Sequence, residues 1–179
     1  MKYKVGIDSN TLTYLIEAMD PNYDPCSDRS NLVNERIALL RIYLYGGIQF
    51  HVVPTVTAEY QKIKNKLKKE THESLCKILL FDEPWNLSDG DVNKKMEQYL
   101  EIHSGENDCR IVAEAELGSV SNLLTCDLDV LKHLQENIQT ELITPSNYWT
   151  KLSIPLGQQP VFSPYDTNPL KNKTWWIWE

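Results

Sequence analysis

The chain has 179 residues, of which 41% are hydrophobic and 24% are charged, and this length suits one domain with its own hydrophobic core. Its 18 Lys and Arg residues against 25 Asp and Glu residues give a net charge of −7, which argues against a protein that coats nucleic acid through bulk positive charge. No apolar run approaches the roughly 18 residues of a membrane-spanning helix, and Asp8 comes before a signal peptide could form its apolar stretch, so we expect neither secretion nor a membrane.

Apolar runs of strand length alternate with helical patterns along most of the chain. Polar caps, Gly and Pro mark their ends; Gly46 and Gly47, for example, stop the second helical pattern. Strands that alternate with helices predict an α/β fold with a mainly parallel sheet and helices on both of its faces. In chain order, the predicted elements are strand 3–7, helix 12–19, helix 32–45, strand 49–53, helix 54–69, helix 73–80, helix 91–103, helix 106–115, strand 122–126, helix 129–137 and strand 140–144.

The last 35 residues differ in composition from the rest of the chain. They hold five of the nine prolines and three tryptophans, Trp175, Trp176 and Trp178. We therefore predict a folded domain over residues 1–145 and an extended Pro/Trp-rich C-terminal arm over residues 146–179, packed on the body or on a partner. The tryptophans could fill an apolar groove of the body, stack on bases, or contact a partner protein or a second copy of the chain.

Four acidic residues follow predicted strands or lie near the start of predicted helices: Asp8, Glu59, Asp108 and Asp127. In parallel α/β sheets the ligand site forms beyond the carboxyl ends of the strands. Each acid alone could be a helix cap or a solvated loop residue. Four carboxylates in one cleft, however, repel one another unless a hard cation such as Mg²⁺ or Mn²⁺ neutralises them. Such an ion activates water and stabilises a reacting phosphoryl group, so the pattern predicts phosphodiester hydrolysis.

Four short segments carry these acids: VGIDSNTL, PTVTAEY, ENDCRIVAEAE and LLTCDLDV. In their residues and their order they resemble the motifs of the PIN-domain nucleases, a family that includes the toxins of VapBC toxin–antitoxin systems. The resemblance extends over about residues 3–144. It implies a three-layer α/β/α domain with a mainly parallel sheet, and a metal-dependent endonuclease that usually acts on RNA.

The resemblance also implies roles for individual residues and for partners. Besides an RNA substrate, it implies an antitoxin protein and a homodimer as partners. Asn10 and Thr125 match polar helpers that orient the ligands or a metal-bound water through hydrogen bonds. Asp129 is either a fifth metal-binding acid or the cap of the helix that follows. The residues implied to be catalytic and to hold Mg²⁺ or Mn²⁺ are Asp8, Glu59, Asp108 and Asp127.

Basic residues that could contact nucleic acid are concentrated in the segment QKIKNKLKKE (61–70), which has five lysines and one glutamate. Lys62 and Lys66 lie three and seven residues after Glu59, on one face of the predicted helix, so they could form a phosphate track. A solvated helix face is the alternative. Arg110 could reach the substrate or form a surface ion pair.

The four cysteines form no CxxC pair, which disfavours structural zinc and fits the reducing cytoplasm. Cys109 and Cys126 adjoin proposed metal ligands, but hard ions prefer oxygen, so we do not expect thiolate ligation. His103 and His133 become candidates for proton transfer only if the fold brings them into the cleft.

Other functions remain open. The run from Asp127 to Val130 resembles the opening motif of haloacid dehalogenase-type phosphatases, but that family places this motif first, and here only 50 residues follow Asp129. A DNA-directed PIN nuclease fits the same acids. A non-catalytic PIN-like module that binds RNA or a protein is the last alternative; the intact set of acids opposes it, because clustered carboxylates without a metal destabilise a fold.

Overall fold

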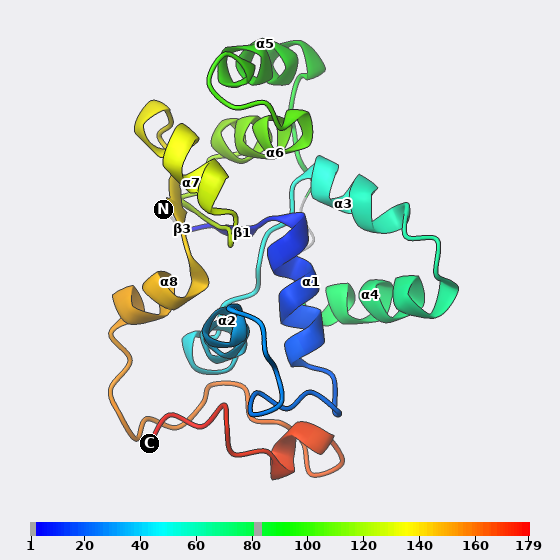
Figure 1. Cartoon of the computed structure of the whole chain (residues 1–179), viewed down its shortest axis with the longest axis vertical. Coiled ribbons are helices and arrows are strands. Elements are labelled where there is room, and N and C mark those ends of the chain that lie inside the picture. The colour runs from blue at the N-terminus through cyan, green and yellow to red at the C-terminus, as the bar shows by residue number, and fades with distance from the viewer. Residues whose placement is uncertain (1–2, 81–83) are drawn as a thin grey trace.

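The computed structural model describes residues 3–80 and 84–179 and shows a mixed α/β fold (Figure 1). Strands β1 (Val5–Ile7), β2 (Asn122–Leu124) and β3 (Glu141–Ile143) form a parallel sheet in the order β1-β2-β3. Val5 pairs with Asn122, which in turn pairs with Glu141. Because the strands are parallel and in register, their carboxyl ends lie at one edge of the sheet.

The helices that surround this sheet begin at residues suited to helix starts. Side chains of Asp8, Asn65, Asp127 and Thr144 accept hydrogen bonds from backbone N–H groups in the first turns that follow them. The helices are α1 (Ser9–Ala18), α2 (Val33–Gly46), α3 (Pro54–Gln61), α4 (Lys66–Leu79), α5 (Asp89–Leu100), α6 (Glu106–Leu117), α7 (Leu128–Leu134) and α8 (Pro145–Leu152), with 3₁₀ turns at Gln135–Asn137 and Pro169–Asn172.

The hydrophobic core includes side chains from the strands and from the helices that pack on them. Ile7 and Leu124 of the sheet, Leu15 of α1 and Leu39 of α2 are completely buried. Helix α5 packs on α6 at one end of the molecule (Figure 1). Among the described residues, none of the helices combines the length and the apolar character that crossing a membrane requires.

The predicted strand over residues 49–53 is much shorter than expected. Only Phe50 and His51 form isolated parallel bridges, with Leu80 and Gly6 respectively. The His51 N–H donates to the Val5 carbonyl at 2.8 Å. Val53 already precedes the first residue of α3, so this segment leaves the sheet after two paired residues.

The single helix predicted over residues 54–69 is also wrong. Helix α3 ends at Gln61, and α4 starts at Lys66 and continues to Leu79. Asn65 starts the second helix because its side-chain oxygen accepts a hydrogen bond from the Lys68 N–H at 2.9 Å. The two helices therefore point in different directions (Figure 1).

The C-terminal segment, expected to be extended from residue 146, begins with helix α8. Ser146 at its start donates from N and Oγ to the Glu35 carboxylate of α2, at 2.8 and 2.7 Å. Residues 153–179 then run back beneath α2 (Figure 1). Trp176 is buried there, and its Nε1–H donates to the Leu170 carbonyl at 2.9 Å. In the structure, this arm packs on the body of the chain.

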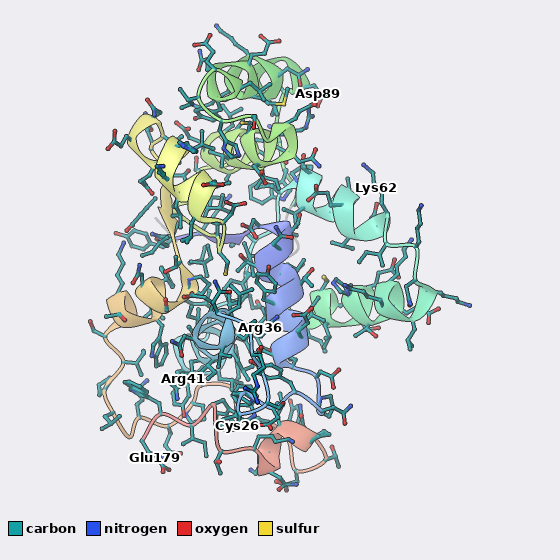
Figure 2. The ribbon with its side chains drawn as sticks, viewed as in Figure 1. Cys26, Arg36, Arg41, Lys62, Asp89 and Glu179 are labelled. Carbon is teal, nitrogen blue, oxygen red and sulfur yellow. The ribbon has the colours of Figure 1, made fainter. Side chains whose placement is uncertain are left out.

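Arg41 of α2 holds the end of the arm. Its guanidinium donates to the carbonyl oxygens of Trp176 (3.0 Å), Ile177 (2.9 Å) and Trp175 (3.4 Å). The same group lies 4.9 Å from the centre of a Trp178 ring. Figure 2 shows Arg41 between α2 and the arm. One side chain therefore satisfies three consecutive backbone carbonyls that no helix or strand pairs.

Candidate functional site

The carboxyl ends of the strands bring Asp8 close to the residues that follow β2. The Asp8 N–H donates to the Leu124 carbonyl at 3.2 Å, and the Thr125 N–H donates to the Ile143 carbonyl at 3.1 Å. These bonds continue the strand pairing by one step beyond β1 and β2. The structure thus places Asp8 and Thr125 at the same edge, as expected from the parallel pattern.

Asp8 lies in a desolvated position. Burial raises the pKa of its carboxyl group, hydrogen bonds with Thr125 and Thr11 oppose that rise, and the charge of Asp108 adds to it. One of these hydrogen bonds, from the Thr11 N–H to Asp8 Oδ1, is 2.7 Å long. The charged form of Asp8 is therefore unfavourable unless a cation binds beside it. Without a cation, the protonated form is favoured.

Asp108 is close enough to Asp8 to influence its ionisation, and it lies in the first turn of α6. Its side chain is 41% exposed, so solvent or a ligand can reach it. His103 Nε2 lies 3.4 Å from Asp108 Oδ2, where an Nε2–H can donate to the carboxylate. The fold thus brings His103 to a proposed ligand, and the His133 ring centre lies 6.0 Å from that of His103.

Gly105, directly before α6, makes room for this pair. A Cβ atom at this position would lie 2.3 Å from Asp108 Oδ2 and 2.7 Å from His103 Nε2. Both distances are shorter than real Cβ contacts. Any other residue type at position 105 would therefore displace the carboxylate, the imidazole or both.

Glu59 of α3 is linked to the starts of two helices. The Ser9 hydroxyl donates to Glu59 Oε2, and the Asn107 side-chain amide donates to Glu59 Oε1 at 2.5 Å. Ser9 follows Asp8 in sequence and Asn107 precedes Asp108, so Glu59 bridges the neighbours of both acids. Sequence reasoning missed Ser9 and Asn107; their positions next to proposed ligands were the available signal.

Asp127 serves partly as the cap of α7. Its Oδ1 accepts hydrogen bonds from the N–H groups of Asp129 (2.8 Å) and Val130 (3.2 Å), and its own N–H donates to Thr125 Oγ1 at 3.0 Å. Asp129 lies exposed in the first turn of α7. The cap is therefore Asp127, and the alternative in which Asp129 caps this helix is wrong.

Of the predicted metal ligands, Asp8 and Asp108 are the two that best suit a metal ion. Within residues 3–80 and 84–179, no three His, Cys, Asp or Glu side chains stand close enough to hold one ion together. Mg²⁺ keeps several waters and is commonly bound by one or two carboxylates together with substrate phosphates. Asp8 and Asp108 are two carboxylates whose charges influence each other, and their oxygen chemistry fits Mg²⁺ or Mn²⁺.

The adjoining cysteines do not offer thiolates. Burial raises the pKa of Cys109 to about 11 and that of Cys126 to about 12. Both thiols therefore stay protonated at neutral pH, and Cys109 Sγ donates to the His103 carbonyl at 3.3 Å.

The structure separates Lys62 and Lys66, the two predicted phosphate-binding lysines. Lys62 follows the last residue of α3, on the outside of the molecule (Figure 2), whereas Lys66 begins α4. The prediction that both share a helical face with Glu59 is wrong, because the helix ends between them. The Lys66 side chain is 90% exposed, with its Nζ 3.8 Å from Glu70.

Arg110 is engaged with groups on its own helix and on α5. Its Nε lies 3.3 Å from Glu114 Oε1, and its Nη1 donates to Asn93 Oδ1 at 2.9 Å. Of the two alternatives for Arg110, the structure shows the ion pair.

Comparison of the sequence with protein-family models and with curated proteins gives no match. The protein is a mixed α/β protein with acidic and hydroxyl side chains gathered at the carboxyl ends of a parallel sheet.

Proposed function

We propose that this chain is a PIN-type nuclease that hydrolyses RNA phosphodiester bonds endonucleolytically with Mg²⁺ or Mn²⁺. The observation that carries the proposal is the desolvated Asp8 carboxyl group directly after β1, whose pKa burial raises and the charge of Asp108 raises further. The two charges are unfavourable without a cation, and oxygen ligands select a hard one. The three-layer α/β/α arrangement of the family belongs to this proposal, which the parallel β1-β2-β3 sheet supports.

Asp8 and Asp108 would hold the ion, which would supply water activation and charge stabilisation at phosphorus. Thr125 and Thr11 orient the Asp8 carboxylate through hydrogen bonds. Glu59, held by Ser9 and Asn107, accepts a hydrogen bond from the attacking water. The first turn of α7 holds the Asp127 carboxylate through the N–H groups of Asp129 and Val130.

The test is a cleavage assay on structured RNA, single-stranded RNA and single-stranded DNA, each with Mn²⁺, Mg²⁺ or EDTA. We expect cutting of RNA with either ion, and none in EDTA. Cutting of DNA alone would replace the substrate class with the DNA-directed alternative. No cutting with any substrate by folded protein would contradict the nuclease proposal.

A non-catalytic PIN-like module that binds RNA or a protein is the second candidate. The absence of a three-ligand group among the described residues favours it. Thermal unfolding with and without Mn²⁺ separates the two candidates, since an ion that binds the folded state raises the unfolding temperature and a chain without a metal site shows no change. The sequence and the resemblance also lead us to propose three further properties. They are binding of an antitoxin, formation of a homodimer and a cytoplasmic location.

Gly105→Ala is expected to reduce cleavage by more than about 10-fold, with little loss of stability. The new Cβ collides with the ends of two side chains, Asp108 and His103, which can move aside but then leave their positions. Loss of an outer partner of a metal ligand typically costs 10–100-fold in activity.

Gly90→Ala is the matched control, because a Cβ there would meet only Ser88 Oγ at 3.7 Å, an ordinary contact. Cleavage rates and urea unfolding of both variants check this expectation. Equal cleavage rates for the two variants would show that the position of Asp108 does not matter.

A further inference from the structure

A pocket of about 270 Å³ lies beside Glu59, between α1, α3 and α4. Ser9 and Glu59, which are linked by a hydrogen bond at the proposed catalytic centre, form one wall. The other lining residues with polar side-chain groups are Asn10, Thr13, Tyr60, Lys68 and His72. The pocket therefore continues the proposed catalytic centre toward α4, and most of its polar groups can take part in hydrogen bonds with a ligand.

His72 presents a hydrogen-bond acceptor to this pocket. Its side chain is buried, and its Nδ1–H donates to the Lys68 carbonyl at 2.9 Å. Burial lowers the pKa of the imidazole, so the ring is neutral at pH 7 and Nε2 carries a lone pair. The nearby Thr13 hydroxyl, 3.5 Å from Nε2, donates its proton to the Ser9 carbonyl at 3.1 Å. Nε2 can therefore accept a hydrogen bond from a hydroxyl or amino group of a ligand.

Lys68 presents a positive charge at the same pocket. Its neighbours Lys66 and Lys69 each lie 3.8 Å from a glutamate, Glu70 and Glu73 respectively. Among the described residues, no carboxylate lies within 4.0 Å of the Lys68 amine. An exposed amine without a nearby carboxylate at the edge of a polar pocket suits a phosphate group.

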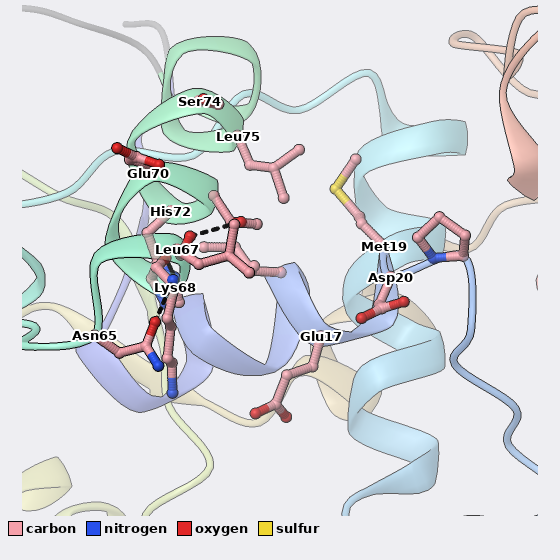
Figure 3. A pocket seen from close by; sticks show the side chains of 13 residues that line it. Glu17, Met19, Asp20, Asn65, Leu67, Lys68, Glu70, His72, Ser74 and Leu75 are labelled. Carbon is pink, nitrogen blue, oxygen red and sulfur yellow. Dashed lines mark hydrogen bonds between the residues drawn. The ribbon is translucent and has the colours of Figure 1, made fainter.

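A larger pocket of about 880 Å³ continues past Lys68 and His72 along the groove between α1 and α4. Figure 3 shows these two residues on one side and Glu17 and Asp20 across from them. Glu17 and Asp20 make their side of the groove unfavourable for a polyanion. A nucleic-acid strand that reaches Lys68 therefore gains nothing by continuing along the groove.

We propose that the pocket beside Glu59 binds one ribonucleotide of the substrate strand, next to the phosphate that is cut. Lys68 contacts the phosphate of this nucleotide, while His72 Nε2 and the Asn10 amide contact its base or ribose. This inference rests on the proposed nuclease function. It implies that the protein contacts only a short stretch of the RNA strand, and that Lys68 contacts phosphate in place of the predicted Lys62 and Lys66.

The test measures binding of short single-stranded RNA in EDTA, where nothing is cut, at several salt concentrations. We expect Lys68→Ala to weaken binding about fivefold and to lower the salt slope by about 0.7, the value for one phosphate contact on a single strand. Lys66→Ala is the matched control and should bind like the wild type. Circular dichroism confirms that both variants are folded.

A second readout does not depend on variants. Addition of AMP, CMP, GMP or UMP should shift the imidazole NMR signals of His72, which lines the pocket. Equal RNA binding by Lys68→Ala and the wild type, with unmoved His72 signals, would overturn the inference even if the protein cuts RNA. Conversely, weaker binding by Lys68→Ala in a protein that never cuts would preserve the pocket and refute the nuclease.

Discussion

The Asp8→Asn protein is expected to lose cleavage by more than about 100-fold and, without divalent ions, to unfold at a higher temperature than the wild type. Loss of an outer partner of a metal ligand already costs 10–100-fold, so loss of a ligand itself costs more. Asn caps a helix as well as Asp does, so α1 keeps its start. The substitution removes a carboxylate whose charged form is disfavoured by burial.

The stability difference should depend on pH in one direction. Because the pKa of Asp8 is raised in the folded state, the protonated form stabilises the fold below the unfolded-state value of 3.8, and this stabilisation is lost as pH rises through the folded-state pKa. The advantage of Asp8→Asn is therefore greatest at neutral pH and shrinks in acid. Thermal unfolding of both proteins in EDTA across this pH range measures it.

Asp28→Asn provides a control of opposite sign. Hydrogen bonds from the Ser30 backbone and side chain, from Tyr23 and the charge of Arg36 lower the pKa of Asp28. Its charged form therefore stabilises the fold above pH 3.8, and the substitution should lower stability at neutral pH and have less effect in acid. An Asp8→Asn protein that is both active and less stable than the wild type would contradict the role given to Asp8.

Arg41→Ala is expected to destabilise the protein by about 2–4 kcal/mol, since hydrogen bonds to charged groups contribute roughly 1.5–3 kcal/mol each and do not add fully. The change leaves the carbonyls of three consecutive residues, 175–177, without their donor and removes the contact with Trp178. Urea unfolding measures the loss.

Two further variants sharpen the Arg41 experiment. Arg41→Lys should recover only part of the stability, because one ammonium group cannot match the planar guanidinium geometry that reaches three carbonyls. Arg29→Ala removes an exposed arginine of the loop before α2 and should change stability by less than about 0.5 kcal/mol. Equal midpoints for Arg41→Ala and Arg29→Ala would mean that the arm is not held by this contact.

Local patterns were sufficient to predict the parallel α/β fold and the position of Asp8. The apolar run before Asp8 and the helix that Asp8 caps are visible in one short stretch of sequence. The same is true of α6 and of the strand before Thr125. The break between α3 and α4 is also local, but the helical spacing of apolar residues obscured the cap at Asn65. Pro145 after Thr144 is a helix start that the proline content of the arm obscured.

The contacts around Glu59 could not have been predicted in this way. Ser9 and Asn107 are 50 and 48 residues from Glu59 in sequence, so their hydrogen bonds depend on how α1, α3 and α6 pack. The same holds for Lys68, which lies at the pocket only because the chain turns after α3 and returns along α1. A sequence shows which residues are charged, whereas tertiary packing determines which of them lie close together.

The attachment of the arm to α2 has a consequence for the order in which the chain folds. Arg41 and its carbonyl partners are separated by 134 to 136 positions, and α8 likewise packs on α2 from far along the chain. Contacts between such distant segments carry a large loop-closure cost. During synthesis, the side of α2 that these segments cover therefore stays exposed until residues 145–179 have left the ribosome, and until then it can contact chaperones or aggregate.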